Sequence, residues 1–434
     1  RGVPFFVGRG IRVPSLPRNR VMSTKRIVVT GIGATSPLGG TAAESWQNLL
    51  AGASGASPLE QDWVAKFDLP VTFAAQAAVK ATDVLERVVT KRLDPSSQFA
   101  LIAGREAWAD AGSPDVDPDR LAIDWATGIG GVWTLLDAYD TLRERGPRRV
   151  LPMTVPMLMP NGPAAAIGMD LGARGGIRTV VSACASSTES IINAWEHLQL
   201  GYADVIIAGG SEAAINPLPI ASFAAMQALS RRNDDPTTAS RPYDVSRDGF
   251  VLGEGAAALV LETYEHAVAR GARIYAEVLG GAVTSDAFHI TAPDPEGAGA
   301  SRAMRQAVER AGRSLDEVVH VNAHATSTPV GDIAEYNALR SVFGDHLDNV
   351  TVAATKASTG HLLGGAGAIE ALFTIKALYE RTVPPTINLN DQDPAIPLNV
   401  PRAPEALPAG DVLALSNSFG FGGHNAVAAF ASVS

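Results

Sequence analysis

The sequence contains little cysteine, few aromatic residues and no long apolar stretch. Cys184 is the only cysteine among the 434 residues, which excludes a disulfide within the chain and a cysteine-rich metal site. A chain without disulfides is typical of a reducing compartment, so we expect a cytoplasmic protein. No apolar run approaches the roughly 20 residues of a membrane span, so no membrane association is expected. The formal charge of −10 gives no basis for nucleic-acid binding.

The composition that remains is that of a large folded chain. Hydrophobic residues make up 46% and charged residues 18%, which allows a substantial core. The length suggests two or more domain-sized units. Residues 1–21 differ from the rest because they are rich in arginine and lack acidic residues. We interpret them as a non-native or disordered basic extension before Met22, and an Arg-rich transit peptide is the alternative.

Short apolar runs alternate with segments of helical spacing along the chain. The alternation predicts an α/β fold, and a repeat of the element order predicts two pseudo-duplicated halves, residues 22–272 and 273–434. Strands are expected at Arg26–Thr30, Val180–Ser182 and Asp204–Ala208, and again at Ile274–Leu279, Val318–Val321, Val350–Ala354, Asp411–Leu415 and Ala426–Phe430. Helices are expected at Ala42–Ala51, Ser97–Ala111 and Ser186–Leu200, and again at Ser301–Ala311 and 364–379.

Cys184 stands where the strand Val180–Ser182 gives way to the helix Ser186–Leu200, among small residues. The field at a helix N-terminus favours the thiolate, which is the nucleophilic form of cysteine. The alternative is a buried, unreactive cysteine that packs as a small apolar residue. The strand-to-helix junction favours the nucleophile.

Two histidines stand at similar junctions and could assist a nucleophile. His324 follows the strand Val318–Val321, and His361 precedes the helix 364–379. In the duplicated scheme, His361 holds the position in the second half that corresponds to Cys184, which would bring the two helix N-termini together. A neutral imidazole there can donate a hydrogen bond to a carbonyl that becomes an enolate. Either histidine could instead be a capping or core residue.

Lys356 is one of few lysines in an arginine-rich chain, and it precedes Gly360-His361. Its compact charge suggests a place in the same site, with Glu335 as a partner. A solvated surface lysine is the alternative.

The segment Asn417–Asn425 is rich in glycine and contains Phe421. Glycines permit close backbone approach, so this loop can direct an N–H group at an oxyanion while Phe421 gates a pocket. A phosphate-binding loop is the rival interpretation. That loop would require a following helix, whereas Ala426–Phe430 has the pattern of a strand.

Taken in order, these motifs resemble the β-ketoacyl-acyl carrier protein synthases, closest to the type II elongating enzymes. The resemblance runs from about Lys25 to the C-terminus. It rests on Ala183-Cys184-Ala185-Ser186, Arg241-Pro242-Tyr243-Asp244, Arg247-Asp248-Gly249-Phe250, Asn322-Ala323-His324 with Thr326 and Thr328, Lys356 with Gly360-His361, and Gly420-Phe421-Gly422-Gly423.

The resemblance implies a thiolase-like five-layer α-β-α-β-α fold, a homodimer, and the decarboxylative condensation of malonyl and acyl groups in type II fatty acid biosynthesis. An acyl carrier protein would bring both groups, and no cofactor or metal is implied. Cys184 would hold the acyl chain as a thioester. The backbone N–H groups of Cys184 and Phe421 would form the oxyanion hole. His324 and His361 would stabilise the enolate, and Lys356 and Glu335 would set the electrostatics.

The resemblance also implies contacts with the acyl chain and with the carrier. The substrate would be bound by Ile129, Phe223, Thr326, Thr328, Phe421 and Gly422. Because acyl carrier proteins are acidic, docking would use local basic patches at Lys91, Arg92, Arg148 and Arg149. The sequence gives no preferred acyl length.

Other functions stay open at this point. The ketosynthase subunit of a type II polyketide pathway has the same chemistry with a different substrate. A thiolase would need a second catalytic cysteine, and an initiating synthase would use a Cys-His-Asn set. A non-catalytic chain-length factor, from a different functional class, would lack the nucleophile Cys184.

Overall fold

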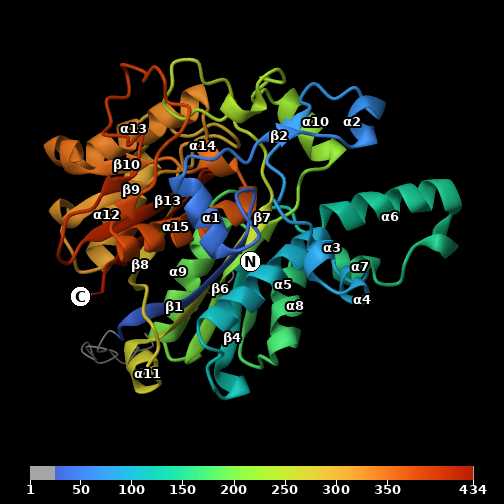
Figure 1. Ribbon diagram of the computed structural model, residues 1–434, viewed down its shortest axis with the longest axis horizontal. Helices are drawn as coiled ribbons and strands as arrows, with labels where there is room; N and C mark the ends of the chain where they lie inside the picture. Colours follow the sequence, from blue (N-terminus) through green and yellow to red (C-terminus); the bar gives the residue numbers. More distant parts are fainter. Residues whose placement is uncertain (1–24, 434) are drawn as a thin grey trace, which may run out of the picture.

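A computed structural model describes residues 25–433, so the expected basic extension at residues 1–21 lies outside the described part. The first half of the chain forms a sheet with helices on both faces (Figure 1). The strands of this half are β1 (Ile27–Thr35), β2 (Ser57–Pro58), β3 (Phe73–Ala74), β4 (Leu121–Ala126), β5 (Ile177–Val180), β6 (Val205–Glu212) and β7 (Gly255–Thr263), of which β2 and β3 form a separate two-stranded sheet. Its helices are α1 (Ala42–Leu50), α2 (Asp62–Lys66), α3 (Ala81–Val84), α4 (Arg87–Thr90), α5 (Pro95–Asp110), α6 (Val132–Arg145), α7 (Thr154–Leu158), α8 (Gly162–Leu171), α9 (Ser186–Gln199), α10 (Pro217–Ala225) and α11 (Tyr264–Ala269).

The second half has the same kind of construction. Its strands are β8 (Ala276–Ser285), β9 (Val318–Asn322), β10 (Thr351–Ala353), β11 (Thr382–Val383), β12 (Glu405–Ala406), β13 (Leu413–Gly420) and β14 (His424–Ala431). Its helices are α12 (Ala298–Arg310), α13 (Pro329–Phe343), α14 (Lys356–Thr359) and α15 (Ala366–Glu380). Short 3-10 turns, η1 to η6, connect several of these elements.

The order of the strands repeats between the halves. The large sheet runs β10-β9-β13-β14-β8-β1-β7-β6-β4-β5, and β1 meets β8 only where Ile27–Val29 pairs with Ala276–Val278. In the first half β4 is parallel to β5 and β6, while β7 is antiparallel to β6 and β1. In the second half β9 is parallel to β10 and β13, while β14 is antiparallel to β13 and β8. This confirms the repeated element order, whereas the boundary near residue 272 stays a prediction.

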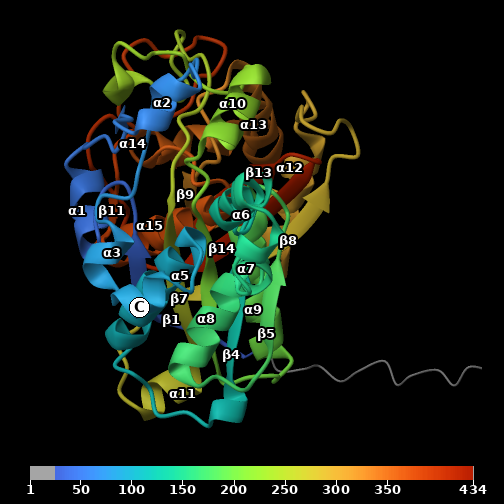
Figure 2. The ribbon, with the colours of Figure 1, turned by 90° about the vertical axis from the view of Figure 1, so that its right-hand side faces the viewer.

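Five layers result from this repeat (Figures 1 and 2). Helices α5 and α8 cover the outer face of the first sheet, and α12 and α13 cover the outer face of the second. Between the sheets lie α9 and α15, which contact each other and strands of both halves. The central helices are buried on nearly all sides: α15 buries Ala366–Phe373 continuously. The expected five-layer α-β-α-β-α arrangement is confirmed.

Small residues make the close packing of the layers possible. The whole of β1 is buried, as is typical of a strand covered on both faces. At Gly33 an added Cβ would lie 2.2 Å from the carbonyl oxygen of Ala103 on α5, so only glycine allows this contact.

The side chain of Asp94 accepts a hydrogen bond from Ser96 N and caps α5 before Pro95.

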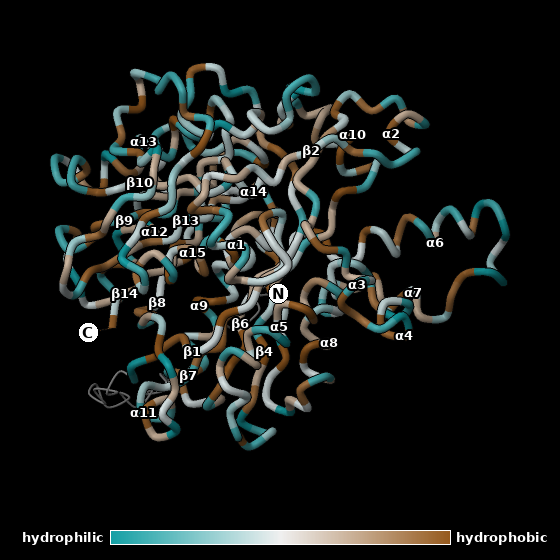
Figure 3. Tube along the Cα trace, in the orientation of Figure 1, coloured by the Kyte–Doolittle hydropathy of each residue, from teal (hydrophilic) through white to brown (hydrophobic). Residues whose placement is uncertain are grey.

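One segment extends away from the layers. Helix α6 projects from the body together with the turn that leads to α7 (Figure 1). Figure 3 shows both hydrophilic and hydrophobic residues along α6, and Leu135, Tyr139 and Leu142 on it are exposed. No helix within residues 25–433 is long and apolar enough to cross a membrane.

The expected strands and helices are all present, with shifted ends. The largest differences are at β1, which continues through Gly31 and Gly33 to Thr35, and at β6, which continues through Gly209 and Gly210 to Glu212. The expected strands stopped at Thr30 and Ala208, just before these glycines. In the structure they lie within the sheet, where an added Cβ would collide with α5 at Gly31 and Gly33, with β7 at Gly209 and with Ser187 of α9 at Gly210.

Candidate active site

Cys184 lies in the turn between β5 and α9. The turn is held by Ser186, whose Oγ accepts a hydrogen bond from Ser182 N at 2.8 Å and donates one to Ala183 O at 2.6 Å. Ala183 has a φ of 51°, which is the left-handed conformation that such a sharp turn requires. The thiol therefore points away from the turn and lines a cavity.

Cys184, His324 and His361 come together at one end of this cavity. Their sulfur and ring-nitrogen atoms all lie within 4.8 Å of one another. The two imidazole rings meet edge to face, with centroids 5.3 Å apart and an interplanar angle of 84°. The duplicated scheme predicted the approach of Cys184 and His361, and His324 joins them from the loop after β9.

His361 follows α14 and begins the approach to α15. Its backbone N–H donates to Val251 O at 2.7 Å, and its ring packs edge-on against Phe250 with centroids 5.3 Å apart. Neither ring nitrogen has a hydrogen-bond partner among the described residues. Burial, and the charge of Lys356, keep the pKa of His361 well below its ordinary value, so the ring is neutral.

His324 lies in a loop between β9 and α13. Burial lowers its pKa well below the ordinary value, and the charge of Lys356 acts in the same direction. Lys356 Nζ lies 3.3 Å from His324 Nδ1 and donates to the His324 carbonyl at 2.6 Å. Because an ammonium can only donate, Nδ1 is an acceptor and the proton of the neutral ring is on Nε2.

The loop around His324 rests on Glu335. One carboxylate oxygen accepts from His324 N at 2.9 Å and the other from Ala325 N at 2.7 Å. Asn417 Nδ2 also donates to Glu335, at 3.1 Å. Burial raises the pKa of Glu335, and these hydrogen bonds act in the opposite direction. Glu335 therefore fixes the backbone of the loop.

Lys356 is fully buried and forms its ion pair with Glu370 on α15. The expected direct pairing of Lys356 with Glu335 is therefore wrong, although the charge of Lys356 still helps to lower the pKa of Glu335. Burial raises the pKa of Glu370, and Lys356 acts in the opposite direction. The alternative of a solvated surface lysine is also excluded.

The protonation state expected for Cys184 is corrected by the structure. Burial raises the pKa of its thiol to about 11, while Lys356 and the backbone N–H of Phe421 act in the opposite direction. The carboxyl groups of Glu212 and Glu370 add to the rise. A thiol with this pKa is in its neutral form near pH 7.

The glycine loop between β13 and β14 approaches the same turn. An added Cβ at Gly420 would lie 2.9 Å from Cys184 N, so the two backbones are in contact. The Phe421 N–H hydrogen-bonds to the Cys184 sulfur. The loop leads into a strand, which excludes the phosphate-loop interpretation.

The cavity has a volume of about 550 Å³ and a mainly apolar lining. Five of the expected substrate-binding residues line it, namely Ile129, Phe223, Thr326, Thr328 and Phe421. Thr326 Oγ1 and Thr328 Oγ1 lie 3.0 Å apart. Gly422 is not part of this lining, and its expected contact with substrate stays a prediction. Its N–H donates to Ile290 O at 2.7 Å and ties the glycine loop to a neighbouring segment.

Sequence reasoning missed two residues that organise the site. Glu212 is buried and accepts hydrogen bonds from Thr127 Oγ1, Gly128 N, Ile129 N and Gly364 N, so it joins the Ile129 segment to the one that follows His361. Phe250 packs between Phe223 and His361. An acidic residue at the end of an apolar strand was the available signal for Glu212, and Phe250 stood in a motif to which no role was assigned.

The four expected docking residues are exposed. Lys91 and Arg92 follow α4, and Arg148 and Arg149 lie in the 3-10 turn that follows α6.

Within the described residues, Cys184, His324 and His361 are also the one cluster with the ligand types and spacing for a metal ion. The positive charge of Lys356, which lies beside His324, disfavours the binding of a metal cation to this cluster.

The comparisons with known proteins agree with this geometry. The sequence matches the family "Beta-ketoacyl synthase, N-terminal domain" over residues 24–267 and "Beta-ketoacyl synthase, C-terminal domain" over residues 275–390. It is 44% identical to 3-oxoacyl-[acyl-carrier-protein] synthase 2 of Mycobacterium bovis, over 93% of this chain and 96% of the relative. It is 45% identical to the protein of the same name from Synechocystis sp., over 94% and 98% of the two chains.

A solved structure has the same fold. It contains a type II PKS acyl-carrier protein in complex with its ketosynthase bound to the hexaketide, and the matching chain gives a TM-score of 0.88. That chain is 32% identical, and the match covers 95% of this chain and all of the other.

The duplicated fold, and a thiol beside two neutral imidazoles on an apolar cavity, define a condensing enzyme of the acyltransferase class. The chain belongs to the β-ketoacyl synthase family.

Proposed function

We propose that this chain is a 3-oxoacyl-[acyl-carrier-protein] synthase of type II fatty acid biosynthesis, which condenses a malonyl unit with an acyl chain held on Cys184. The observation that carries the proposal is the convergence of Cys184, His324 and His361 within 4.8 Å on the apolar cavity. The reaction needs a nucleophile, donors for an enolate oxygen and room for an acyl chain. This site offers all three.

In the first half-reaction, the Cys184 sulfur attacks the thioester carbonyl of an acyl carrier protein. The Cys184 N–H and the Phe421 N–H lie beside the sulfur and stabilise the tetrahedral oxyanion. Because the thiol rests in its neutral form, its proton must leave during the attack. The proton then passes to the carrier thiolate as the old carbon–sulfur bond breaks.

In the second half-reaction, a malonyl thioester loses CO2. The electron pair of the breaking carbon–carbon bond forms an enolate, whose oxygen accepts hydrogen bonds from the neutral rings of His324 and His361. Burial keeps both rings neutral, so each carries one N–H for this purpose. The enolate carbon then attacks the Cys184 thioester. The new carbon–carbon bond forms and Cys184 leaves as a thiolate, which takes up a proton.

A polyketide ketosynthase is the second candidate, since the solved structure similar to this chain comes from such a system. Identity to it is 32%, against 44% and 45% for the two 3-oxoacyl synthases, which favours the fatty acid assignment. A chain-length factor lacks a nucleophile, whereas Cys184 is present here and lines the cavity.

The proposed partners are an acyl carrier protein and a second copy of the chain in the cytoplasm. The exposed basic side chains of Lys91, Arg92, Arg148 and Arg149 suit an acidic carrier. Strand β5 is the unpaired edge of its half-sheet, and an exposed edge with apolar side chains is a pairing surface. The exposed apolar residues there and on the neighbouring elements are Leu135, Tyr139, Leu151, Val155, Met169, Ile177 and Val181.

The experiment that tests the proposed function is a turnover series. The purified protein is given malonyl-carrier thioester with saturated acyl-carrier thioesters of increasing length, and the 3-oxoacyl product is measured. Saturated acyl chains should be extended by two carbons with release of one CO2 per product. If saturated chains give no product and short polyketone thioesters do, the polyketide candidate replaces the proposal.

A further inference from the structure

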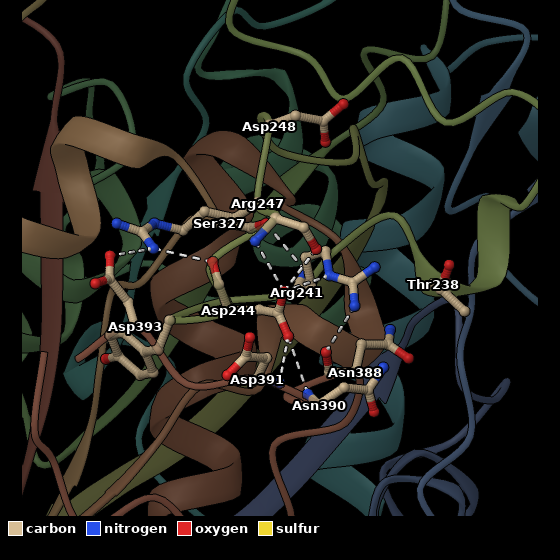
Figure 4. Close-up of polar contacts among 12 residues, drawn as sticks. Thr238, Arg241, Asp244, Arg247, Asp248, Ser327, Asn388, Asn390, Asp391 and Asp393 are labelled. Carbon is tan, nitrogen blue, oxygen red and sulfur yellow. Dashed lines mark hydrogen bonds and ion pairs between the residues drawn. The ribbon is translucent and has the colours of Figure 1, made fainter. Parts of the chain in front are cut away.

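Five charged residues form a network, most of it buried, that contacts the loop following His324. We call Arg241, Asp244, Arg247, Asp332 and Asp393 the arginine–aspartate network (Figure 4). All but Asp393 are buried, which is rare for arginine and aspartate unless they are paired. The network includes residues of the two sequence motifs, at 241–244 and 247–250, to which the proposed reaction gives no role.

The network pairs its charges internally and with a long surface segment. Arg241 Nε lies 3.2 Å from Asp244 Oδ1, and Arg247 lies 2.9 Å from Asp393 and 3.6 Å from Asp332. Asp244 also accepts hydrogen bonds from Asn390 N and Asp391 N, at 3.0 and 2.9 Å. Backbone hydrogen bonds contribute to holding the pKa of Asp244 below its ordinary range. The charges are therefore fixed in position from several directions.

Every polar atom of Ser327 is hydrogen-bonded, two of them to network residues and one to Gly249. Ser327 N donates to Asp332 at 3.1 Å, and Ser327 Oγ accepts from Arg241 N at 2.9 Å. Ser327 O accepts from Gly249 N at 3.0 Å. Arg247 reaches the next two carbonyls along the chain, those of Thr328 at 3.4 Å and Pro329 at 3.3 Å.

The held segment is backbone that would not keep its shape unaided. Ala325 and Ser327 have φ angles of 25° and 68°, in the left-handed region that non-glycine residues avoid. Such conformations persist when surrounding contacts over-determine them. Thr326 and Thr328, on either side of Ser327, line the cavity, and His324 stands at the start of the same loop.

We propose that the arginine–aspartate network is a positioning device for the His324–Thr328 loop, and that it sets the malonyl half-reaction without affecting acyl transfer to Cys184. The inference rests on the proposed function. Within residues 25–433, no hydrogen bond or ion pair of the five network residues ends on the turn that carries Cys184. Disturbing the network should thus move His324 and the threonine hydroxyl groups and leave the nucleophile in place.

Three variants and one control test this. Ser327→Ala removes one hydrogen bond to the network, and Asp332→Asn removes a buried charge with little change of shape. Asp393→Asn weakens the ion pair between Arg247 and Asp393, the one network residue that is partly exposed. Asp248→Asn is the matched control, because Asp248 belongs to the same sequence motif but is exposed and contacts Arg231 and Arg232. In Figure 4 its side chain lies apart from the dashed network.

Two half-reactions are measured on each preparation. One is CO2 release from malonyl-carrier thioester without an acyl donor, and the other is acylation of Cys184 followed by intact mass. Unfolded protein lowers both rates equally, so their ratio reports positioning. We expect Ser327→Ala and Asp332→Asn to lower the ratio of decarboxylation to acylation at least tenfold and to raise KM for the malonyl thioester. Asp393→Asn should give a smaller drop, and the control should match the wild type.

A ratio that stays within twofold of the wild type in Ser327→Ala and Asp332→Asn would overturn the inference, because the network would then be structural only. Equal losses in both half-reactions would overturn it for the same reason. Failure of the proposed function has a different signature, since the wild-type protein itself would then perform neither half-reaction.

Discussion

Cys184 and His361 occupy equivalent positions in the two halves of the chain. Cys184 lies between β5 and α9, and His361 lies between β10 and α15. Both strands are the outermost of their half-sheets, and both helices run in the middle layer and contact each other. The duplication thus places a nucleophile and a hydrogen-bond donor on opposite sides of one internal axis. His324, the third member of the site, lies in neither of these two turns. Its loop is held by hydrogen bonds to Glu335 and Lys356.

The histidines should be separable from the nucleophile by mutation. His324→Ala and His361→Ala should still accept an acyl group on Cys184, while decarboxylation of malonyl thioester falls by about 100-fold or more, because each ring donates to the enolate oxygen. Acylation is measured by intact mass and decarboxylation by CO2 release. His346→Ala is the control, since its Nε2 contacts Val318 O away from the cavity. Unchanged decarboxylation in His361→Ala would show that the assigned enolate role is wrong.

The reactivity of the resting thiol should depend steeply on pH. The pKa of Cys184 is raised to about 11, so the thiolate is a minor form at neutral pH and its fraction grows about tenfold per pH unit up to that value. Alkylation by uncharged iodoacetamide should therefore accelerate about tenfold per unit from pH 7 to 9. The protein has one cysteine, so the signal has no background. A rate that levels off near pH 7 would instead indicate the thiolate that the sequence suggested.

The buried pair of Lys356 and Glu370 should be strongly coupled. Removing either charge alone leaves its partner buried without compensation, which costs about 3–5 kcal/mol in the free energy of unfolding. Lys356→Met and Glu370→Leu should each show such a loss by denaturant unfolding. The double variant should lose much less than the sum, because an apolar pair can replace a buried ion pair. Additive losses would contradict a direct interaction between the two side chains.

The range of acyl chains should follow the space around Phe223 and Ile129. Phe223 packs edge-on against Phe250, with ring centroids 5.4 Å apart, and lines the cavity. Phe223→Ala should raise the turnover of the longest accepted acyl-carrier substrate relative to the shortest by about fivefold or more. Ile129→Phe should shift the ratio the other way. The pocket assignment fails if the two variants shift the length profile in the same direction or leave it unchanged.

Local sequence patterns predicted the α/β class and the strand-to-helix junctions at Cys184 and His361, but they did not predict β4, β7 or α13. The five-layer arrangement and most roles in the site were implied by the family resemblance. Periodicity predicted the strands and helices that carry these residues, and the repeated order placed His361 in the position that corresponds to Cys184. The expected strands stopped before the glycines of β1 and β6, because the need for glycine arises from helices and strands that pack on them from elsewhere in the sequence.

The parts that could not be predicted depend on three-dimensional surroundings. The high pKa of Cys184 follows from burial near Glu212 and Glu370, neither of which is close to it in sequence. Lys356 has two acidic residues within reach, and only the packing of α15 shows that Glu370 is the direct partner. Glu212 gathers donors from two separate segments, a role that no spacing rule reveals.

The central claim is that Cys184 carries the acyl chain. Its most direct test is intact-mass and peptide analysis after incubation with an acyl-carrier thioester, for the wild type and Cys184→Ala. The account predicts one acyl group per wild-type chain, located on Cys184, its release when malonyl-carrier thioester is added, and no adduct on the variant. A wild-type protein that forms no adduct, or a variant that still condenses acyl and malonyl groups, would contradict it.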